Sequence, residues 1–259
     1  MMQADTGGAP RLSIVMPAYN EATRLPESFA RMREYLDACD FTSEVVVVDD
    51  GSTDDTAALT KEWTTVWPAL RLISEPHHGK GAAVRAGVLA ARGEIIALAD
   101  ADLSMPPAEF DRLLMAIDAG SEIAIGSREA PGARRYGEPE YRHLMGRIFN
   151  RLVQIIALPG IQDTQCGFKC MRSAVAHDLC AHQSIDGWGF DVELLYIARL
   201  RGYPMKEVSI PWYYITGSRV HPVRDTVTMV RDVLHVRISG ILGRYRQHAP
   251  ERKSVPVMR

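Results

Sequence analysis

Two aspartates stand one residue apart at the end of an apolar run. Asp100 and Asp102 follow residues 95–99, a short apolar stretch that is typical of a buried strand. Where a strand gives way to a loop, side chains at i and i+2 share a face, so both carboxylates can converge on one small volume. Two carboxylates in one site repel each other unless a cation neutralises them. Hard divalent cations bind carboxylates together with substrate phosphates, so the triplet predicts a metal–diphosphate site. The alternative is a polar loop after a strand.

Three further polar motifs follow other predicted strands. Residues 17–21 (Pro-Ala-Tyr-Asn-Glu) offer an aromatic ring for a nucleoside base and a carboxylate that accepts hydrogen bonds. Residues 49–54 (Asp-Asp-Gly-Ser-Thr-Asp) offer an acceptor for a pyrimidine N3–H. Residues 79–81 (Gly-Lys-Gly) let the backbone approach a phosphate and supply a positive charge, but they lack the spacing of a Walker loop. Loops that cap helices are the alternative for the first two.

Alternating strand and helix patterns separate these motifs. Short apolar runs predict strands at 12–16, 45–48, 70–73, 95–99 and 122–126, and helices are predicted at 25–38, 54–65, 81–92 and 106–118. Such a series builds an α/β fold whose mostly parallel sheet is flanked by helices. Ligands bind at the carboxyl ends of parallel strands, so the four motifs should meet at one edge.

The pattern changes after residue 126. An Arg/Gly/Pro-rich loop at 127–140 precedes an amphipathic stretch at 141–158, strands at 167–171 and 206–212, and a final helix at about 222–246. No linker or repeat is evident. We therefore expect one domain over 11–246, with a nucleotide-binding half at 11–126 and an acceptor-side half at 127–246. The ends, 1–10 and 247–259, are expected to be disordered and flexible tails.

Composition narrows the classes of function. The chain has 259 residues, 46% of them hydrophobic, and a net charge of −2, which argues against a nucleic-acid partner. No signal-peptide pattern and no run of 18 apolar residues is present. The four cysteines show no disulfide framework, which favours a cytoplasmic location. A zinc site from Cys166, Cys170, His177 and His182 is disfavoured because the gap between its two pairs is short.

In this order the motifs resemble the family 2 glycosyltransferases of the GT-A fold. The second half adds Asp-Thr-Gln-Cys-Gly-Phe-Lys at 163–169, Trp-Gly-Phe-Asp-Val-Glu at 188–193 and Thr-Gly-Ser-Arg at 216–219. These segments are similar to the dolichyl-phosphate β-glucosyltransferases. The resemblance runs over about residues 11–245.

The resemblance implies an inverting, metal-dependent transfer of glucose from UDP-glucose to a polyprenyl (dolichyl or undecaprenyl) phosphate. Asp50 would read the uracil, and Asp100 and Asp102 would hold Mg²⁺ or Mn²⁺, which acts as a Lewis acid on the leaving UDP. The acceptor phosphate is already ionised at pH 7, so no general base is required. The implied nucleotide-binding set is Pro17, Ala18, Tyr19, Glu21, Asp50, Lys80, Asp100, Ala101 and Asp102.

The resemblance also places the acceptor phosphate on basic residues. Arg128, Arg134 and Arg135 match the family's phosphate-binding region, and Lys169 is a weaker candidate. Guanidinium groups suit bidentate contacts with phosphate. A solvated basic loop is the alternative.

Two segments could reach a membrane. The final helix carries an apolar stripe flanked by arginines, namely Val223, Val227, Val230, Leu234, Ile238, Ile241 and Tyr245. The stretch 141–158 repeats this character with Leu144, Ile148, Leu152 and Ile155. Such helices suit a membrane interface, and we expect peripheral association with the cytoplasmic face. Two helices that pack on the core are the alternative.

The sequence also bears on three other classes of function. The nearest is a family 2 transferase that uses another nucleotide sugar or a soluble acceptor. A sugar nucleotidyltransferase would have a glycine-rich, arginine-bearing loop after its first strand, where this chain has residues 17–21. A non-catalytic nucleotide-binding module would not need the intact carboxylates of Asp100 and Asp102.

Overall fold

A seven-stranded sheet forms the centre of the molecule. The computed structural model describes residues 8–215 and 222–245, without the side chains of 222–226. The strand order is β3-β2-β1-β4-β7-β5-β8. Their bounds are β1 (Leu12–Ala18), β2 (Ser43–Asp50), β3 (Leu70–Glu75), β4 (Ile95–Leu98), β5 (Ile123–Ser127), β7 (Lys169–Arg172) and β8 (Met205–Ser209). Only β7 runs antiparallel to its neighbours, so the expected α/β fold with a mostly parallel sheet is confirmed.

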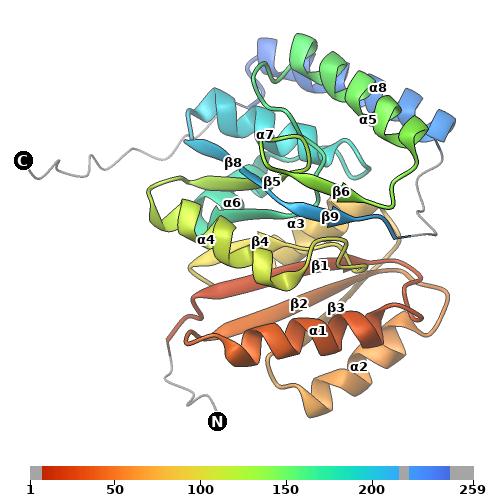
Figure 1. The fold of residues 1–259 in the computed structure, drawn as a ribbon, viewed down its shortest axis with the longest axis vertical. Coiled ribbons are helices and arrows are strands. Elements are labelled where there is room, and N and C mark those ends of the chain that lie inside the picture. Colours follow the sequence, from red (N-terminus) through yellow and green to blue (C-terminus); the bar gives the residue numbers. More distant parts are fainter. Residues whose placement is uncertain (1–7, 216–221, 246–259) are drawn as a thin grey trace, which may run out of the picture.

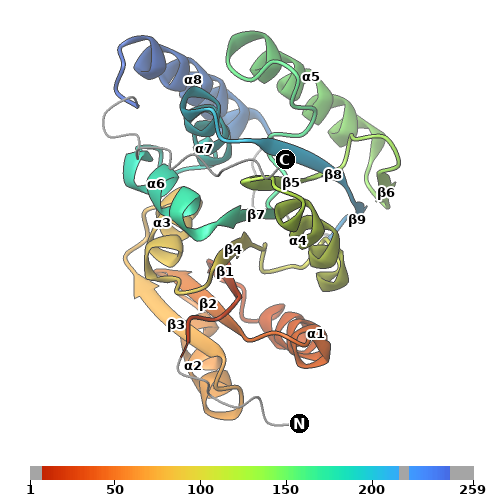
Figure 2. The same cartoon turned by 90° about the vertical axis from the view of Figure 1, so that its left-hand side faces the viewer.

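Helices cover both faces of this sheet. They are α1 (Leu25–Ala38), α2 (Thr56–Val66), α3 (Lys80–Ala90), η1 (Pro107–Glu109), α4 (Phe110–Asp118), α5 (Glu140–Ile156), α6 (Ser173–His182), α7 (Phe190–Arg201) and α8 (Pro222–Ile241). Figure 2 shows α1 and α4 on one side of the sheet and α3, α6 and α7 on the other. The helices α5 and α8 lie together at one end of the molecule (Figure 1).

Local sequence explains the central elements. The four valines at 45–48 of β2 are all fully buried, as expected for a parallel strand with helices on both faces. Val46 and Val48 pack in a cluster with α3, whereas Val45 and Val47 pack with α1. In α1 the buried residues Leu25, Phe29, Met32 and Leu36 follow helical spacing. The sheet is therefore a rigid support for the loops at its edge.

The antiparallel direction of β7 affects the carboxyl edge of the sheet. The parallel strands end at this edge, whereas β7 begins at it. Residues 166–168, just before β7, therefore lie beside the ends of β4 and β5. The sequence predicts a strand at 167–171 but not its direction.

The loop predicted at 127–140 contains a strand. Strand β6 (Arg134–Tyr136) pairs with β9 (Pro211–Tyr213) in a separate two-stranded sheet. The rings of Tyr136 and Tyr213 stack across it at 4.7 Å between centroids. The strand predicted at 206–212 is correspondingly divided into β8 and β9.

Some expectations fall outside the described residues. These include the Thr-Gly-Ser-Arg motif at 216–219, most of the N-terminal tail and residues 246–259. Within the predicted tail 1–10, the carbonyl of Pro10 accepts a hydrogen bond from the backbone of Glu94 at 2.9 Å. In the part of the chain that the structure describes, no helix combines the length and apolarity needed to cross a membrane.

Candidate active site

A cavity of about 750 Å³ opens at the carboxyl edge of the sheet. The ends of β1, β2 and β4, the start of α3 and the residues before β7 line one part of it. Residues of α5 and α8 and those around β9 line the other part. Of the predicted site residues, its lining includes Pro17, Ala18, Tyr19, Glu21, Asp50, Lys80, Asp100, Ala101, Asp102 and Arg128. The structure thus brings together the whole predicted nucleotide-binding set.

Lys80 and Asp100 form an ion pair in this cavity. Lys80 is the first residue of α3, and its Nζ lies 2.5 Å from Oδ1 of Asp100. The Nζ also lies 5.3 Å from the centroid of the Trp188 ring. Burial alone would lower the pKa of Lys80, but the carboxylates of Asp100 and Asp191 outweigh it and raise that pKa. For Asp100, burial is likewise outweighed by Lys80, and the pKa of its carboxyl is lowered.

Asp102 carries the second carboxylate. Its Oδ1 accepts hydrogen bonds from the backbone N–H and the hydroxyl of Ser104, at 3.0 and 2.9 Å. Burial, and then the nearby charge of Asp100, raise the pKa of Asp102. No ion pair to Asp102 occurs among the residues described here. Two carboxylates therefore have a single lysine beside them. Their oxygens are the kind of ligand that a hard divalent cation binds.

Gly167 holds the Asp100 carboxylate from the other side. A Cβ at Gly167 would lie 2.2 Å from Oδ2 of Asp100, which is closer than atoms can approach. The glycine belongs to the segment before β7 that the antiparallel strand brings to this edge. Only a residue without a side chain fits there without moving Asp100.

The end of the cavity predicted to bind the base is lined by stacked rings. Tyr19 stacks on His77 at 4.2 Å between centroids, with 19° between the ring planes. Nδ1 of His77 lies 2.8 Å from Oδ2 of Asp50, and the same carboxylate accepts backbone N–H bonds from His78 and Gly79. Asp50, predicted to read uracil, thus also holds the loop that leads into α3.

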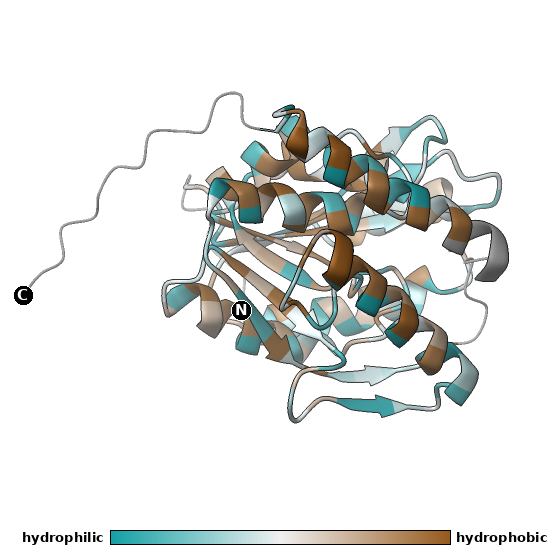
Figure 3. Ribbon diagram, turned by 90° about the horizontal axis from the view of Figure 1, so that it is seen from above, coloured by the Kyte–Doolittle hydropathy of each residue, from teal (hydrophilic) through white to brown (hydrophobic). Residues whose placement is uncertain are grey.

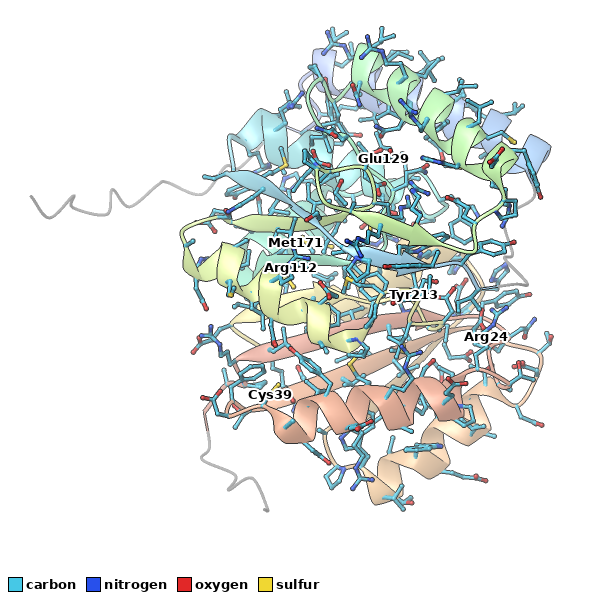
Figure 4. The ribbon with its side chains drawn as sticks, in the orientation of Figure 1. Arg24, Cys39, Arg112, Glu129, Met171 and Tyr213 are labelled. Carbon is cyan, nitrogen blue, oxygen red and sulfur yellow. The ribbon has the colours of Figure 1, made fainter. Side chains whose placement is uncertain are left out.

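Glu21 is the other carboxylate predicted to bind the nucleotide at this end of the cavity, and a cationic side chain pairs with it. Glu21 forms an ion pair with Arg24 at 2.8 Å. Figure 4 shows Arg24 at the start of α1, below Tyr213 of β9.

On the acceptor side, Arg128 is paired with a carboxylate. Its guanidinium donates to both oxygens of Asp163, at 2.7 and 2.8 Å, and lies over the ring of Trp212. Burial would raise the pKa of Asp163, but Arg128 outweighs it and lowers that pKa to about 2. The charge of Arg128 is therefore already balanced inside the protein.

The other three predicted acceptor residues do not line the cavity. Arg135 pairs with Glu129 and Glu138, while Arg134 is exposed on β6. Lys169 is fully buried and pairs with Asp191. The lysine thus positions Asp191, which does line the cavity. A direct contact of these three residues with the acceptor stays a prediction.

Sequence reasoning did not assign Arg142 to the site. It stands in the first turn of α5, lines the cavity and donates to the hydroxyl of Tyr214 at 2.9 Å. Among the described residues no carboxylate pairs with it. Met145, Gly146 and Phe149 line the cavity from the same helix. These four residues stand at positions i, i+3, i+4 and i+7, so they share one face of the helix. This spacing, with an arginine at its start, is the signal in the sequence that could have assigned Arg142 to the site.

The zinc alternative is not supported. Nε2 of His177 bonds the carbonyl of Val88, and Nδ1 of His182 bonds that of Asp178, both at 2.8 Å. All four cysteines are free thiols. Over residues 8–215 and 222–245, no group of three or more His, Cys, Asp or Glu is arranged to hold a metal.

The two amphipathic helices are partly buried and partly exposed. Phe149 and Val153 of α5 and Val233 and Val236 of α8 pack in the core. The exposed apolar side chains, here called the α5–α8 apolar face, are Tyr141, Leu144, Met145, Ile148, Ile155, Val227, Leu234, Ile238, Ile241 and Leu242. Figure 3, viewed from this end, shows apolar residues recurring along both helices.

The predicted stripe on the final helix is therefore only partly right. Tyr245 is buried, and its hydroxyl donates to Glu193 at 2.8 Å, so it belongs to the core side. Val230 and Leu152 are half-buried. The side chain of Val223 lies outside the described part of the chain.

Comparison with known proteins identifies the family. Residues 13–180 match the model of glycosyl transferase family 2. The dolichyl-phosphate beta-glucosyltransferase of Mus musculus is 36% identical over 256 residues, which cover 91% of this chain and 78% of the relative. The enzyme of that name from Saccharomyces cerevisiae is 31% identical and covers 92% and 77%.

Solved structures support the fold. The glucosyl-3-phosphoglycerate synthase of Mycobacterium tuberculosis in complex with phosphoglyceric acid superposes with a TM-score of 0.64 at 20% identity, over 92% of this chain and 80% of that one. The same enzyme in complex with Mn²⁺, UDP-glucose and phosphoglyceric acid gives 0.63, at the same identity and coverage. From the cavity, the strand-end motifs and these matches together, we conclude that the chain is a glycosyltransferase of family 2 with a GT-A-like fold, similar over most of its length to the dolichyl-phosphate β-glucosyltransferases.

Proposed function

We propose that this protein transfers glucose from UDP-glucose to a polyprenyl phosphate, with inversion and with a divalent metal. One observation carries the proposal: a single cavity joins the carboxylate pair at the strand ends to Arg142 and the apolar wall of α5. A nucleotide diphosphate suits the first part, and a phosphate on an apolar chain suits the second. The names of the relatives support this acceptor, and the Mn²⁺ and UDP-glucose bound to the mycobacterial synthase support the donor.

The donor would lie along the strand ends. Tyr19 and Asp50, which line the cavity, would contact the base, and Lys80 would contact the diphosphate. Asp100 and Asp102 would hold Mg²⁺ or Mn²⁺, which when bound stabilises the negative charge that develops on the leaving UDP. The protein itself contributes position and charge.

The acceptor phosphate would bind Arg142. A guanidinium without a carboxylate partner can form two hydrogen bonds to phosphate oxygens, whereas Arg128 would first have to leave Asp163. The phosphate is the nucleophile and is ionised at pH 7, so no proton has to be removed. Attack from the side opposite UDP inverts the anomeric carbon.

The lipid chain would reach this phosphate from the α5–α8 apolar face. Met145 of α5 and Met229 of α8 both line the cavity, so the face and the cavity are continuous. Exposed arginines, Arg147, Arg151, Arg231, Arg237 and Arg244, lie on or just beyond the same helices and suit anionic headgroups. We therefore place the protein peripherally on the cytoplasmic face of a membrane.

Vesicle flotation tests this surface. Wild type should float with anionic liposomes, and the double variant Ile148→Glu, Ile238→Glu should remain in the soluble fraction, because two charges would enter the apolar layer. Met115→Glu is the matched control, since Met115 is equally exposed but on α4. Loss of flotation in the control as well, or in neither variant, would count against the α5–α8 apolar face.

A matrix of donors and acceptors tests the proposed chemistry. The purified protein is incubated with Mn²⁺, with labelled UDP-glucose, UDP-galactose or GDP-mannose, and with either polyprenyl phosphate or 3-phosphoglycerate. We expect label from UDP-glucose in the lipid phase, and NMR of the product should show a β-glucosyl phosphate. Preference for another nucleotide sugar would overturn the donor, and a water-soluble product alone would overturn the lipid acceptor.

A further inference from the structure

We propose that Lys80 and the divalent metal compete for the carboxylate of Asp100, and that the diphosphate of the donor ends this competition by offering Lys80 another anionic partner. The inference rests on the proposed function, since it takes the donor to be a nucleotide diphosphate bound with a metal. It assigns Lys80 a second role besides contact with the diphosphate, namely control of the affinity for the metal.

The Lys80 ammonium already occupies one side of the Asp100 carboxylate, which would also be a ligand of the metal. Nζ of Lys80 lies 2.5 Å from Oδ1 of Asp100, and Lys80, Asp100 and Asp102 all line the cavity. A metal bound to both Asp100 and Asp102 would therefore have an ammonium as a close neighbour. Like charges at such a separation repel each other strongly unless water screens them, so binding the metal beside the ammonium has a cost in free energy.

The carboxylate of Asp100 is packed on one side against Gly167. Gly167 contacts its carboxylate so closely that even a methyl group does not fit between them. The carboxylate of Asp102 is held in turn by Ser104. The lysine has the longest and most flexible side chain of this group, so it is the member best able to move.

The cavity offers Lys80 another position. Its side chain is 20% exposed and lies along the cavity wall at the start of α3, where diphosphate oxygens would lie in the proposed function. Trp188 lines the same wall and already contacts the ammonium. Moving from Asp100 to the diphosphate keeps the lysine paired while the metal takes the carboxylate.

The consequence is a coupling between the metal and the nucleotide. Without nucleotide, the metal has to displace Lys80 and binds weakly; with nucleotide, that cost disappears. Coupling is reciprocal, so the metal also strengthens nucleotide binding. The metal and the nucleotide would also strengthen each other's binding without any competition, because the diphosphate offers its own oxygens as metal ligands. The two explanations differ in the metal affinity measured without nucleotide. Only competition predicts that removing the lysine increases this affinity.

Mn²⁺ binding without catalysis separates the two accounts. Free Mn²⁺ is measured by EPR with and without saturating UDP, for wild type, Lys80→Met, Lys80→Gln and the control Lys61→Met, whose lysine is exposed on α2. Without UDP, both Lys80 variants should bind Mn²⁺ about tenfold more tightly than wild type. The gain in affinity on adding UDP should be smaller in the variants than in wild type, and their affinity for UDP in the presence of Mn²⁺ should fall. Lys61→Met should match wild type throughout.

The outcomes distinguish this inference from the proposed function. If folded Lys80→Met and Lys80→Gln, as judged by circular dichroism, bind Mn²⁺ alone no more tightly than wild type, the competition is wrong while the proposed function stands. If wild type binds neither Mn²⁺ nor UDP, the proposed function fails and the inference fails with it.

Discussion

Replacing Gly167 by alanine should slow transfer about a hundredfold while the protein still folds. The added Cβ would lie 2.2 Å from Oδ2 and 2.6 Å from Cγ of Asp100, whereas a Cβ is essentially never found closer than 3.0 Å to another atom. The carboxylate therefore has to move by about 1 Å, away from the place where it meets Lys80 and would meet the metal. A displacement of that size in a catalytic group costs about a hundredfold in rate.

Stability should change much less than activity in this variant. The group that has to move is the end of a partly exposed side chain on the cavity wall, not a segment of the core. Alanine also restricts the unfolded chain, which favours folding by about 0.4–1 kcal/mol and offsets part of the strain. We expect the free energy of unfolding to stay within about 1 kcal/mol of wild type.

Gly146 provides the control. It lines the same cavity from α5, yet a Cβ there meets nothing within 4 Å. Gly146→Ala should keep transfer within about twofold and stabilise the helix by up to about 1 kcal/mol. The assay is kcat/KM for glucose transfer, with Mn²⁺ affinity from EPR and unfolding in urea. Wild-type kcat/KM and Mn²⁺ affinity in a folded Gly167→Ala protein would refute this description of the carboxylate site.

Three further predictions concern other parts of the cavity. Asp163→Asn should lower the free energy of unfolding at pH 7 by about 2–3 kcal/mol, because the pKa of Asp163 in the folded protein is about 2 against an ordinary value of 3.8. This stabilisation is complete above about pH 4 and is lost as the pH falls toward 2. In urea titrations, the difference in free energy of unfolding between wild type and variant should therefore shrink over that pH range. A difference that does not change with pH would contradict the pairing of Asp163 with Arg128. Arg142→Ala should raise the KM for polyprenyl phosphate at least about tenfold and leave the KM for UDP-glucose unchanged, and Lys61→Ala, on exposed α2, should change neither; equal effects of the two variants would argue against Arg142 as the phosphate ligand. Tyr19→Ala should weaken UDP binding in calorimetry about tenfold because a ring that stacks in the cavity is lost, and an unchanged affinity would place the base elsewhere.

The donor side of the site could be predicted from the sequence because it depends on a local rule. Each motif follows a strand, and parallel strands end at one edge, so residues 17–21, Asp50, Lys80, Asp100 and Asp102 had to meet once the strands were recognised. This prediction needs neither the distances between these side chains nor their ion pairs. The pairing of Lys80 with Asp100, by contrast, became visible only in three dimensions.

The acceptor side depends on contacts between distant parts of the chain. Arg128 bonds Asp163, 35 residues away, and nothing local in the sequence shows that its charge is balanced. Lys169 lies on the antiparallel strand β7 with its side chain in the interior, next to Asp191. Arg134 and Arg135 lie on a strand where a loop was predicted. Composition identified a basic region here, but only the fold shows that Arg128 and Arg135 are already paired with carboxylates.

Helical periodicity likewise identified α5 and α8 but not which residues each buries. Tyr245 continues the spacing of the exposed residues Ile238 and Ile241, yet it packs in the core because the chain leaves the helix after Ile241 and turns at Gly243, which has φ +74. The helical period of the apolar residues predicts only that a helix has an apolar face and a polar face. The neighbouring elements decide which residues are buried, and here α7 with its Glu193 does so.

Transfer of labelled glucose into the lipid phase is the most direct measurement. Wild type and Asp102→Asn are incubated with UDP-[¹⁴C]glucose, Mn²⁺ and polyprenyl phosphate, with and without EDTA, and the organic phase is counted. The proposed function predicts label in the organic phase for wild type, loss of that label with EDTA, and a loss of at least about a hundredfold in the variant. Label that reaches the organic phase equally well from Asp102→Asn, or no lipid-linked label from wild type, would contradict it.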